Sequence, residues 1–517
     1  MALLSTDRWP HVSLWRWETL AYAAAAGLIG LHIAALQGRI DRDSANILVV
    51  AHEIAGGAVP YKDIFDNKPP ALHYWYALLI AITDSNGIVA AKLSLLMANL
   101  STALFVFLAG KRLGGEATGL VAVVLLLYGM LAFEGTLPLT EPYMAMFLAL
   151  GFWLLLRNLA LGFSRRRSAM LGAVFALATL FKLPAAAAML PVFAVLMWAS
   201  ASRETPSANR NGFSFLRREA IVPAATFIAG FLSVWTVTLL LLTGAGALPD
   251  FLSTIVGNLD ARVRYRSFAQ YVDRNRGQFL GFPLLWELAA MGLVMILASW
   301  RRDHSVRART PQGEGWTPGA PWALTGLAAF MFIADTVPRA AHPHYWLGHL
   351  PFLALLAALG ATGLLSLLAP RRWLLGPALV LSGYLAYPSW PGVTRFVDGL
   401  AENQRDALAQ QAFAAQIRSY TRDDERIMMI AYQPIFYLLS ERWPAYRYAM
   451  FTGGGTAAIA EANAGAIRLL ESGAVRHVVI ADDDISYLAE PTQRYVRETF
   501  HLIVEDKAVS AGLYEAP

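Results

Sequence analysis

The residues best suited to chemistry lie in the first loop, residues 39–87, between two long apolar segments. This loop carries two carboxylates in the run Asp41 to Ser44, and a lysine among further carboxylates in the run Val59 to Pro70. A carboxylate can accept a proton as a general base, and an ammonium group can stabilise an anion. Ionisable groups beside a membrane cost free energy unless they are paired or used, so a functional site is one interpretation. A solvated loop that turns at its two closing prolines is the other, and the residues alone leave both open.

Two further charged side chains are expected near the ends of predicted helices. Glu141 starts the helix expected over residues 140–157, and Lys182 lies at the end of the helix expected over residues 169–184. Both ends should lie on the same side as the first loop, so either side chain could reach the same cavity. A structural ion pair between two helices is an equally good interpretation.

A cluster of arginines follows the helix expected over residues 220–243. If that helix ends outside, the cluster breaks the rule that basic residues gather in cytoplasmic loops. An anionic ligand on the outer side would explain the cluster, and so would an interfacial helix bound to anionic lipid. Its members are Arg262, Arg264, Arg266, Arg274 and Arg276.

Three histidines, His342, His344 and His349, raise the question of a metal site. The first two flank a proline in a loop, and the spacing of the three matches no ligand pattern. The chain has no cysteine, which excludes thiolate catalysis, disulfides and Cys-ligated zinc. We therefore assign no metal ligand and no cofactor, and the sequence leaves metal dependence open.

The composition identifies a membrane protein. Of the 517 residues, 56% are hydrophobic and 15% are charged, whereas roughly 25% of the residues in a soluble domain are charged. The apolar residues form blocks of roughly 15 to 25, long enough to cross a hydrocarbon core of about 30 Å. The net charge of +5 comes from short basic clusters between these blocks. Such clusters report membrane orientation, so we expect no nucleic-acid partner.

The basic clusters orient the chain in the membrane, because short cytoplasmic loops are rich in Lys and Arg. Arg8 and Arg16 place the N-terminus inside. We expect eleven membrane-spanning helices, over residues 17–37, 88–110, 117–133, 140–157, 169–184, 186–200, 220–243, 280–300, 321–337, 346–368 and 373–389. The expected inner turns carry Lys111 and Arg112; Arg157 with Arg165, Arg166 and Arg167; Arg203 to Arg218; Arg301 and Arg302 with Arg307 and Arg309; and Arg371 and Arg372.

Two segments do not fit the length of a simple span. Residues 71–83 are apolar but would form a helix of only about 20 Å, so we expect them to lie at the membrane interface. The helices over 169–184 and 186–200 are short and flank Pro184. They form either two spans or one broken hairpin.

A small soluble domain is predicted after the membrane region. We expect strands over 426–432, 476–481 and 501–504 and helices over 456–470 and 491–500, an alternation that favours an α/β domain. The sequence thus divides into a membrane domain, residues 1–390, and an α/β domain, residues 391–517. Because an odd number of spans starts inside, this second domain should be extracytoplasmic.

The motifs of the first loop resemble those of the GT-C glycosyltransferases. These multi-spanning enzymes include the protein mannosyltransferases and the bacterial aminoarabinose transferases of lipid A. The resemblance rests on Arg42-Asp43-Ser44 and on the run from Pro60 to Pro70. Weaker matches are Thr140-Glu141-Pro142, Thr179-Leu180-Phe181-Lys182 and His342-Pro343-His344-Tyr345. It covers roughly residues 17 to 370 and implies a GT-C-like fold.

The resemblance implies that a sugar is transferred from a polyprenyl-phosphate donor to an acceptor hydroxyl on the outer face, with inversion at the anomeric carbon. It makes Asp43 the general base. Asp41 is the rival, because two residues on an extended segment face the same way if the turn permits. It gives Lys68 the donor phosphate, although a lysine that merely reaches the interface is the simpler alternative. We group Asp43 and Glu141 as catalytic, and as substrate-binding we group Asp41, Tyr61, Asp66, Lys68, Lys182, Arg262, Arg264, His344 and Tyr345.

A transporter or flippase for a lipid-linked saccharide is the rival class, because polar residues at helix ends also line substrate paths. Transporters keep charged groups near the bilayer midplane and have repeated halves, whereas this sequence concentrates charge in its outer loops. A ligand sensor would leave the polar first loop unexplained. The expected location is a bacterial-type inner membrane, with membrane lipid around the chain. The sugar, the oligomeric state and the nature of the acceptor (lipid, glycan or protein) are not encoded in any recognisable pattern.

Overall fold

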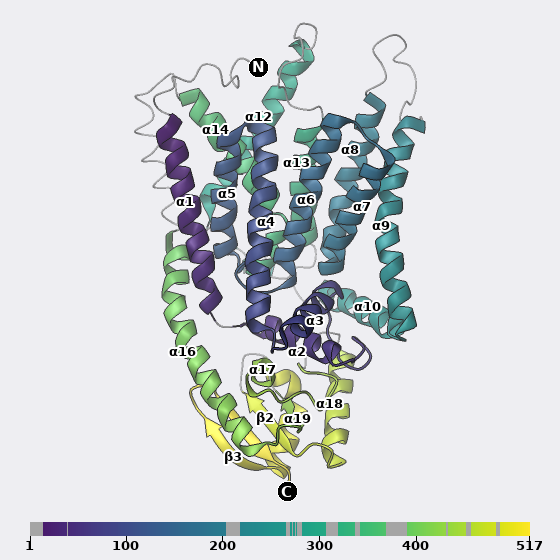
Figure 1. The fold of residues 1–517 in the computed structure, drawn as a ribbon, viewed down its shortest axis with the longest axis vertical. Helices are drawn as coiled ribbons and strands as arrows, with labels where there is room; N and C mark the ends of the chain where they lie inside the picture. The colour runs from purple at the N-terminus through teal and green to yellow at the C-terminus, as the bar shows by residue number, and fades with distance from the viewer. Residues whose placement is uncertain are drawn as a thin grey trace.

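The protein is a bundle of helices with a small α/β domain at one end (Figure 1). The computed structural model describes residues 14–38, 40–202, 218–264, 269–270, 272–273, 276, 282–306, 319–336, 342–368, 390–430, 433–450, 456–481 and 486–517. We call the end of the bundle that faces the α/β domain the domain end.

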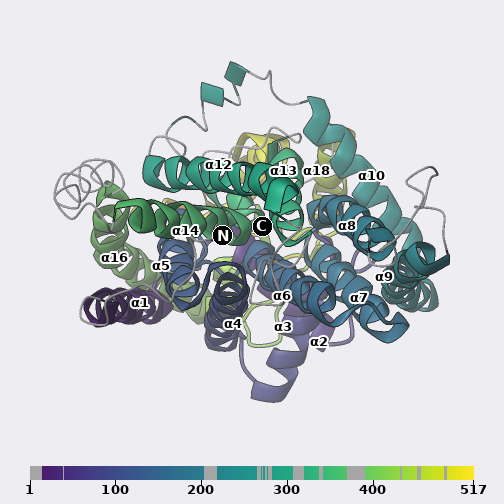
Figure 2. The same cartoon turned by 90° about the horizontal axis from the view of Figure 1, so that it is seen from above.

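The bundle is built from long, mainly apolar helices that run side by side (Figures 1 and 2). Its helices are α1 (Leu14–Ala34), α4 (Ile88–Gly114), α5 (Glu116–Ala132), α6 (Thr140–Leu161), α7 (Arg165–Phe181), α8 (Met189–Ser202), α9 (Arg218–Gly244), α12 (Pro283–Val306), α13 (Ala320–Thr336) and α14 (Leu350–Leu368). Six segments of the described chain are long and apolar enough to cross a membrane, and five shorter apolar helices accompany them. The chain is therefore a multi-pass membrane protein. The helix expected over 373–389 lies outside the described residues, so the count of eleven spans stays a prediction.

The chain breaks between α7 and α8 as the position of Pro184 suggests. Helix α7 ends at Phe181, Lys182 is extended, and the short 3-10 helix η3 (Leu183–Ala188) leads into α8. Proline cannot continue an α-helix because it lacks the N–H group and its ring clashes with the preceding turn. The two segments are therefore separate helices of the bundle, and Lys182 lies at the junction.

Close helix crossings hold the bundle together. A Cβ atom at Gly172 of α7 would collide with the carbonyl oxygen of Phe227 on α9, and one at Gly230 would collide with that of Ala169. Helices α12 and α14 cross in the same way at Gly292 and Gly360. Small residues let backbones approach closely in a membrane, where van der Waals packing rather than the hydrophobic effect drives association.

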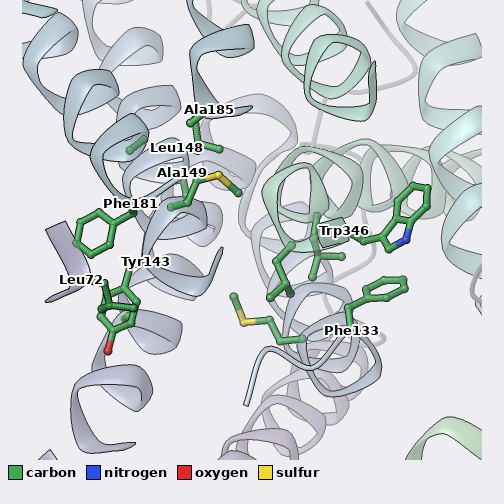
Figure 3. Packing of buried hydrophobic residues seen from close by; sticks show 14 of the residues in the cluster. Leu72, Phe133, Tyr143, Leu148, Ala149, Phe181, Ala185 and Trp346 are labelled. Carbon is green, nitrogen blue, oxygen red and sulfur yellow. The ribbon is translucent and has the colours of Figure 1, made fainter. Parts of the chain in front are cut away.

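The apolar core continues to the domain end of the bundle, where it supports the polar residues described below. Figure 3 shows part of this core, with Leu72, Phe133, Tyr143, Leu148, Ala149, Phe181, Ala185 and Trp346 labelled. These side chains come from α3, α6, α7, η3 and the segments next to them, and all of them are buried. The same elements carry the charged residues of the site, so packing fixes where those residues can lie.

Three short helices cover the domain end, namely α2 (Arg42–Ala55), α3 (Ala71–Thr83) and α10 (Leu248–Arg264) (Figure 1). We expected no helix where α2 forms, but the structure shows one, and its residues Ser44 to Ala51 are all buried. Helix α3 has the predicted bounds, and its 13 residues are too few to cross a membrane.

The α/β domain contains a four-stranded sheet in the order β1-β2-β4-β3. Strands β1 (Met428–Ile430) and β2 (His477–Ala481) are parallel, whereas β4 (Ala511–Glu515) is antiparallel to both β2 and β3 (His501–Asp506). The helices are α16 (Trp390–Tyr420), α17 (Ile435–Ser440), α18 (Thr456–Glu471) and α19 (Glu490–Thr499), with the 3-10 turn η8 (Ser486–Ala489). The sequence predicted three of the strands together with α18 and α19, and it missed β4, α16 and α17.

Thiol labelling can test the orientation of this fold, because the chain has no cysteine of its own. We expect an impermeant reagent to modify Asp63→Cys and Lys507→Cys from the outer face, since Asp63 of the first loop and Lys507 of the α/β domain are both exposed. Lys111→Cys, in the turn between α4 and α5, should react only after the inner face is opened. The reverse pattern would invert the orientation, and labelling of positions 63 and 507 from opposite faces would contradict the fold.

Candidate functional site

Asp41 and Asp43 mark the start of α2. Asp41 is the N-cap, and its side chain accepts hydrogen bonds from the backbone N–H of Asp43 at 3.1 Å and from the hydroxyl of Ser44. Asp43 is the second residue of the helix, where the helix dipole favours a negative charge. Asp41 and Asp43 therefore do not lie on one extended segment, as the comparison of the two as rival bases assumed, because the extended backbone ends at Asp41.

The environment of Asp41 differs from that of a surface carboxylate. Burial raises its pKa from the ordinary 3.8 to about 6, and the negative charge of Asp43 acts in the same direction. The hydrogen bond from Ser44 opposes this shift without cancelling it. Both oxygens of Asp41 are already engaged in the cap, whereas the Asp43 side chain is 32% exposed.

Lys68 lies between two carboxylates. Its Nζ is 3.7 Å from Oδ1 of Asp43 and 3.7 Å from Oδ1 of Asp66. Asp66 also accepts a hydrogen bond of 2.7 Å from Nε2 of His73, on α3. Burial by itself would raise the pKa of Asp66, but the Lys68 ammonium and the His73 contact outweigh it and hold that pKa below its ordinary value. Asp66 therefore stays ionised and anchors the lysine.

The hydroxyl of Tyr61 faces the backbone of the first loop. It donates a hydrogen bond of 2.8 Å to the carbonyl oxygen of Lys68. The side chain is 1% exposed and packs edge-on against Phe251 of α10. Of the residues that we grouped as substrate-binding, Tyr61 and Asp66 are thus buried and engaged with the protein, which favours a positioning role over direct contact with a substrate.

A second charged group forms where α6 begins and α7 ends. Lys182 donates to the carboxylate of Glu141, and the hydroxyl of Thr140 donates to the same carboxylate at 2.8 Å. The Lys182 ammonium also lies 3.6 Å from the ring centroid of Tyr345, a cation–π contact. Glu141 is 2% exposed, so this ion pair is buried.

The histidine run before α14 joins the two charged groups. Nδ1 of His344 lies 2.8 Å from a carboxylate oxygen of Glu134, and its Nε2 lies 3.6 Å from Glu141. Burial lowers the pKa of His342, and the negative charges of Asp43 and Glu134 oppose this, so His342 lies near both carboxylates. A positive charge on His344 would lower the pKa of Asp41, so these two side chains are also neighbours. The structure therefore brings the start of α2, the first loop, the start of α6, the end of α7 and the histidine run into one site.

Glu134 is a site residue that the sequence analysis missed. It lies in the short connection between α5 and α6, with a positive backbone φ of 59°. A non-glycine residue in this conformation is uncommon and is often found at functional positions. A carboxylate between two apolar helices, at the same end as Glu141, was the signal that could have identified it.

The remaining predicted residues are only partly described. Arg262 and Arg264 lie in the last turns of α10, but their side chains are outside the described part of the structure, as are Arg266 and Arg274 altogether. Arg276 is exposed. Participation of the arginine cluster in the site therefore stays a prediction.

His349 has a different partner from the other two histidines. Its Nδ1 lies 2.9 Å from Oδ2 of Asp335, near the end of α13, and both side chains are buried. Within the described residues, no three His, Asp or Glu side chains are arranged to hold a metal ion.

Comparisons with known families and curated sequences give one match. The model of the family described as dolichyl-phosphate-mannose-protein mannosyltransferase matches residues 67–211, which include Lys68, Glu141 and Lys182. A comparison with curated protein sequences finds no match.

Solved structures of two membrane proteins have the same fold. ArnT from Cupriavidus metallidurans bound to undecaprenyl phosphate superimposes with a TM-score of 0.58 at 14% identity, over 97% of this chain and 98% of that one. The archaeal oligosaccharyltransferase AglB from Archaeoglobus fulgidus, in complex with an inhibitory peptide and a dolichol-phosphate, gives a TM-score of 0.55 at 12% identity. That alignment covers 98% of this chain and 75% of AglB. The resemblance therefore extends over the bundle and the α/β domain together.

The raised pKa of Asp41 predicts how stability depends on pH. Because the folded protein holds the Asp41 proton more tightly than the unfolded chain, stability should fall as pH rises from about 4 through about 6. Asp41→Asn keeps an N-cap side chain and cannot ionise, so its melting temperature should not show this decrease. Melting curves of both proteins from pH 4 to pH 8 test the prediction. Parallel curves across that range would show that Asp41 ionises normally.

Proposed function

Membership of the GT-C superfamily, which the family-model match and the shared fold support, is the premise from which we propose that this protein is a membrane glycosyltransferase. It would transfer a sugar from a polyprenyl-phosphate donor to an acceptor hydroxyl. The observation that carries the proposal is the placement of the Lys68 ammonium 3.7 Å from Asp43. The Glu141 and Lys182 pair belongs to the same site, because Asp43 and Lys182 both influence the pKa of His342. A cation for a phosphate and a carboxylate for a proton thus lie side by side.

What the two similar structures contain supports the proposed class of donor. ArnT is bound to undecaprenyl phosphate and AglB to a dolichol-phosphate, and both ligands are polyprenyl-type phosphates. A donor of this kind keeps its chain in the lipid and its phosphate at the surface. Helices α2 and α3 cover the end of the bundle, so a phosphate at Lys68 would lie at that level.

Asp43 is the residue that we propose as the general base. An alcohol is a weak nucleophile, and a positioned carboxylate that accepts its proton raises the rate by about 10² to 10⁴. Asp43 is partly exposed, whereas both oxygens of its rival Asp41 are used in capping α2. Asp41 would then act through Asp43, because it holds the first turn of the helix in place.

Lys68 is the proposed contact of the donor phosphate. As the bond between sugar and phosphate breaks, negative charge grows on the leaving oxygen, and a nearby ammonium group stabilises it. Attack by the acceptor on the opposite face of the sugar would invert the anomeric carbon, as in one-step glycosyl transfer with a single base. For this attack the sugar must lie between Asp43 and Lys68, so their contact of 3.7 Å would have to open when the donor binds.

Glu141, Lys182, His344 and Tyr345 form the other wall of the proposed site. Glu141 is buried and holds Lys182, so we propose that it supports catalysis by fixing this second cation. Tyr345 lies against the same ammonium and His344 lies beside Glu141. Lys182 and Tyr345 are partly exposed, so these two side chains are placed to contact the sugar or its phosphate, whereas His344 is buried.

A transporter of a lipid-linked saccharide is a weaker explanation of the site. The charged side chains lie at helix ends, next to α2 and the α/β domain, and not half-way along the bundle. We propose that this end faces the outside of a bacterial-type inner membrane, with an extracytoplasmic α/β domain. An acceptor could then be a lipid, a glycan or a protein of the cell envelope.

Replacement of Asp43 by Asn tests the role of the base. Asn keeps the size and hydrogen bonding of the side chain but cannot accept the proton of the acceptor. We expect the transfer rate to fall by a factor of about 10² to 10⁴, equivalent to about 3 to 5 kcal/mol in the transition state. The measurement is transfer from a radiolabelled polyprenyl-phosphate sugar, with binding of the donor retained.

Asp41→Asn is the matched control and should keep most of the activity. If Asp41→Asn abolished transfer while Asp43→Asn kept more than about a tenth of the rate, the base would be Asp41. If neither variant changed transfer, the assignment of a glycosyltransferase site to this loop would fail.

Replacement of Lys68 by Ala tests the phosphate contact. We expect the Michaelis constant for the donor to rise by about tenfold or more, because a charge-assisted contact to phosphate contributes about 1.5 to 3 kcal/mol. Lys62→Ala, an exposed lysine of the same loop, should change it less than twofold. Normal use of the donor by Lys68→Ala would move the phosphate site to the arginines that follow α10.

A further inference from the structure

The α/β domain reaches the first loop through Arg447, in the segment between α17 and α18. The guanidinium group of Arg447 donates a hydrogen bond to the carbonyl oxygen of Tyr61. In the opposite direction, the backbone N–H of Phe65 donates to the carbonyl oxygen of Arg447 at 2.8 Å. One residue of the α/β domain thus forms hydrogen bonds with the first loop at Tyr61 and at Phe65, on either side of the turn between them.

The same arginine also contacts α10. Its Nη2 lies 3.8 Å from Oδ1 of Asp250, in the first turn of that helix. Tyr61 packs against α10 as well, because its ring meets Phe251 at a centroid distance of 5.1 Å. Arg447, the turn of the first loop and the start of α10 therefore form one contact region, although they are far apart in the sequence.

Tyr61 needs such support because its backbone is strained. Its φ of 69° lies in the left-handed region, which costs a bulky residue about 1 to 3 kcal/mol. The turn is closed by a hydrogen bond of 2.7 Å from the N–H of Tyr61 to the carbonyl oxygen of Ile64. A strained conformation of this kind persists only where surrounding contacts stabilise it. The hydrogen bond from Arg447 to the Tyr61 carbonyl is one of these contacts.

The contact continues from Tyr61 to the site lysine. The Tyr61 hydroxyl donates to the carbonyl oxygen of Lys68, and the Lys68 ammonium lies 3.7 Å from both Asp43 and Asp66. Two hydrogen bonds thus connect Arg447 with the backbone of Lys68. A misplacement of about 1 Å at a catalytic group can cost a factor of about 10² in rate.

We propose that Arg447 is a positioning residue that sets the Lys68 ammonium through Tyr61, and that the α/β domain thereby controls how well the site holds its donor phosphate. The proposal rests on the proposed function, because it assumes that Lys68 meets the phosphate. An arginine suits this role since both contacts use Nη2, whose two N–H groups lie in the plane of the guanidinium and can bond the Tyr61 carbonyl and face the Asp250 carboxylate at once. A lysine keeps the charge but presents it at a single point.

Contacts other than those of Arg447 also hold the α/β domain against α2. Arg426 forms an ion pair with Glu53 of α2 at 3.1 Å. Trp443 stacks on His52, with ring centroids 3.3 Å apart. These contacts do not involve the Tyr61 turn, so Arg447→Ala should leave the domain docked. Arg426→Ala is the matched control, because it removes an arginine contact between the same two parts of the protein.

The kinetic test uses the full-length protein in nanodiscs, with a polyprenyl-phosphate sugar as donor. We expect Arg447→Ala to raise the Michaelis constant of the donor by about tenfold while that of the acceptor changes less than twofold. Arg447→Lys should recover part of the loss, and Arg426→Ala should stay within twofold of the wild type. Tyr61→Phe should weaken donor use similarly, and the double variant with Arg447→Ala should be no worse than either single one.

A second test does not require activity. With Lys68→Cys as the sole thiol of the chain, Arg447→Ala should raise its rate of maleimide labelling several-fold, and Arg426→Ala should not. If labelling rises but the wild type transfers no sugar, the connection stands and the proposed function fails. Unchanged labelling, additive effects of the two substitutions, or equal losses for donor and acceptor would overturn the role of Arg447.

Discussion

The ion pair between Glu141 and Lys182 ties the beginning of α6 to the end of α7, and the rest of the site is arranged around it. A charge in an apolar bundle costs several kcal/mol unless it is paired. Ionisable side chains therefore lie at the ends of the helices or form pairs with one another. Removal of Glu141 would leave Lys182 without this partner, and the reverse would leave a buried carboxylate. The break of the helix at Lys182 therefore has two effects. It redirects the chain from α7 to α8, and it brings the Lys182 ammonium to the end of the bundle.

Neighbouring charges explain why the carboxylates of one site differ in pKa. A nearby cation offsets the effect of burial on one carboxylate, and a nearby anion adds to that effect on another. Asp66 is held ionised by Lys68 and His73, whereas Asp41 is buried beside another negative charge and has a raised pKa. Asp43 lies next to the helix N-terminus and 3.7 Å from the Lys68 ammonium. Differences of this kind let neighbouring carboxyl groups take separate tasks, one structural and one chemical.

The sequence predicted most of the fold, because apolar blocks and basic clusters follow directly from the physics of the bilayer. It also identified Asp43, Lys68, Glu141, Lys182 and His344, which the structure brings together, although their roles remain proposals. It missed the helical form of α2, since a buried helix with a polar first turn resembles a loop in hydropathy. It missed Glu134 and the part of Arg447, because both depend on contacts between segments far apart in the chain. Strand β4 escaped notice since its five residues carry little apolar pattern.

Helix α16 affects how strong the contacts between the α/β domain and the first loop need to be. Its 31 residues would extend about 46 Å, and it connects the bundle with the α/β domain as one continuous element. The domain is thus a tethered ligand of the first loop, present at an effective concentration in the millimolar range or above. Contacts worth only about 5.5 kcal/mol, a dissociation constant of about 0.1 mM, would leave two separate molecules mostly apart at micromolar concentration. At a millimolar effective concentration the same contacts keep the loop occupied about nine-tenths of the time. The interface can therefore be modest and open briefly without the domain being lost.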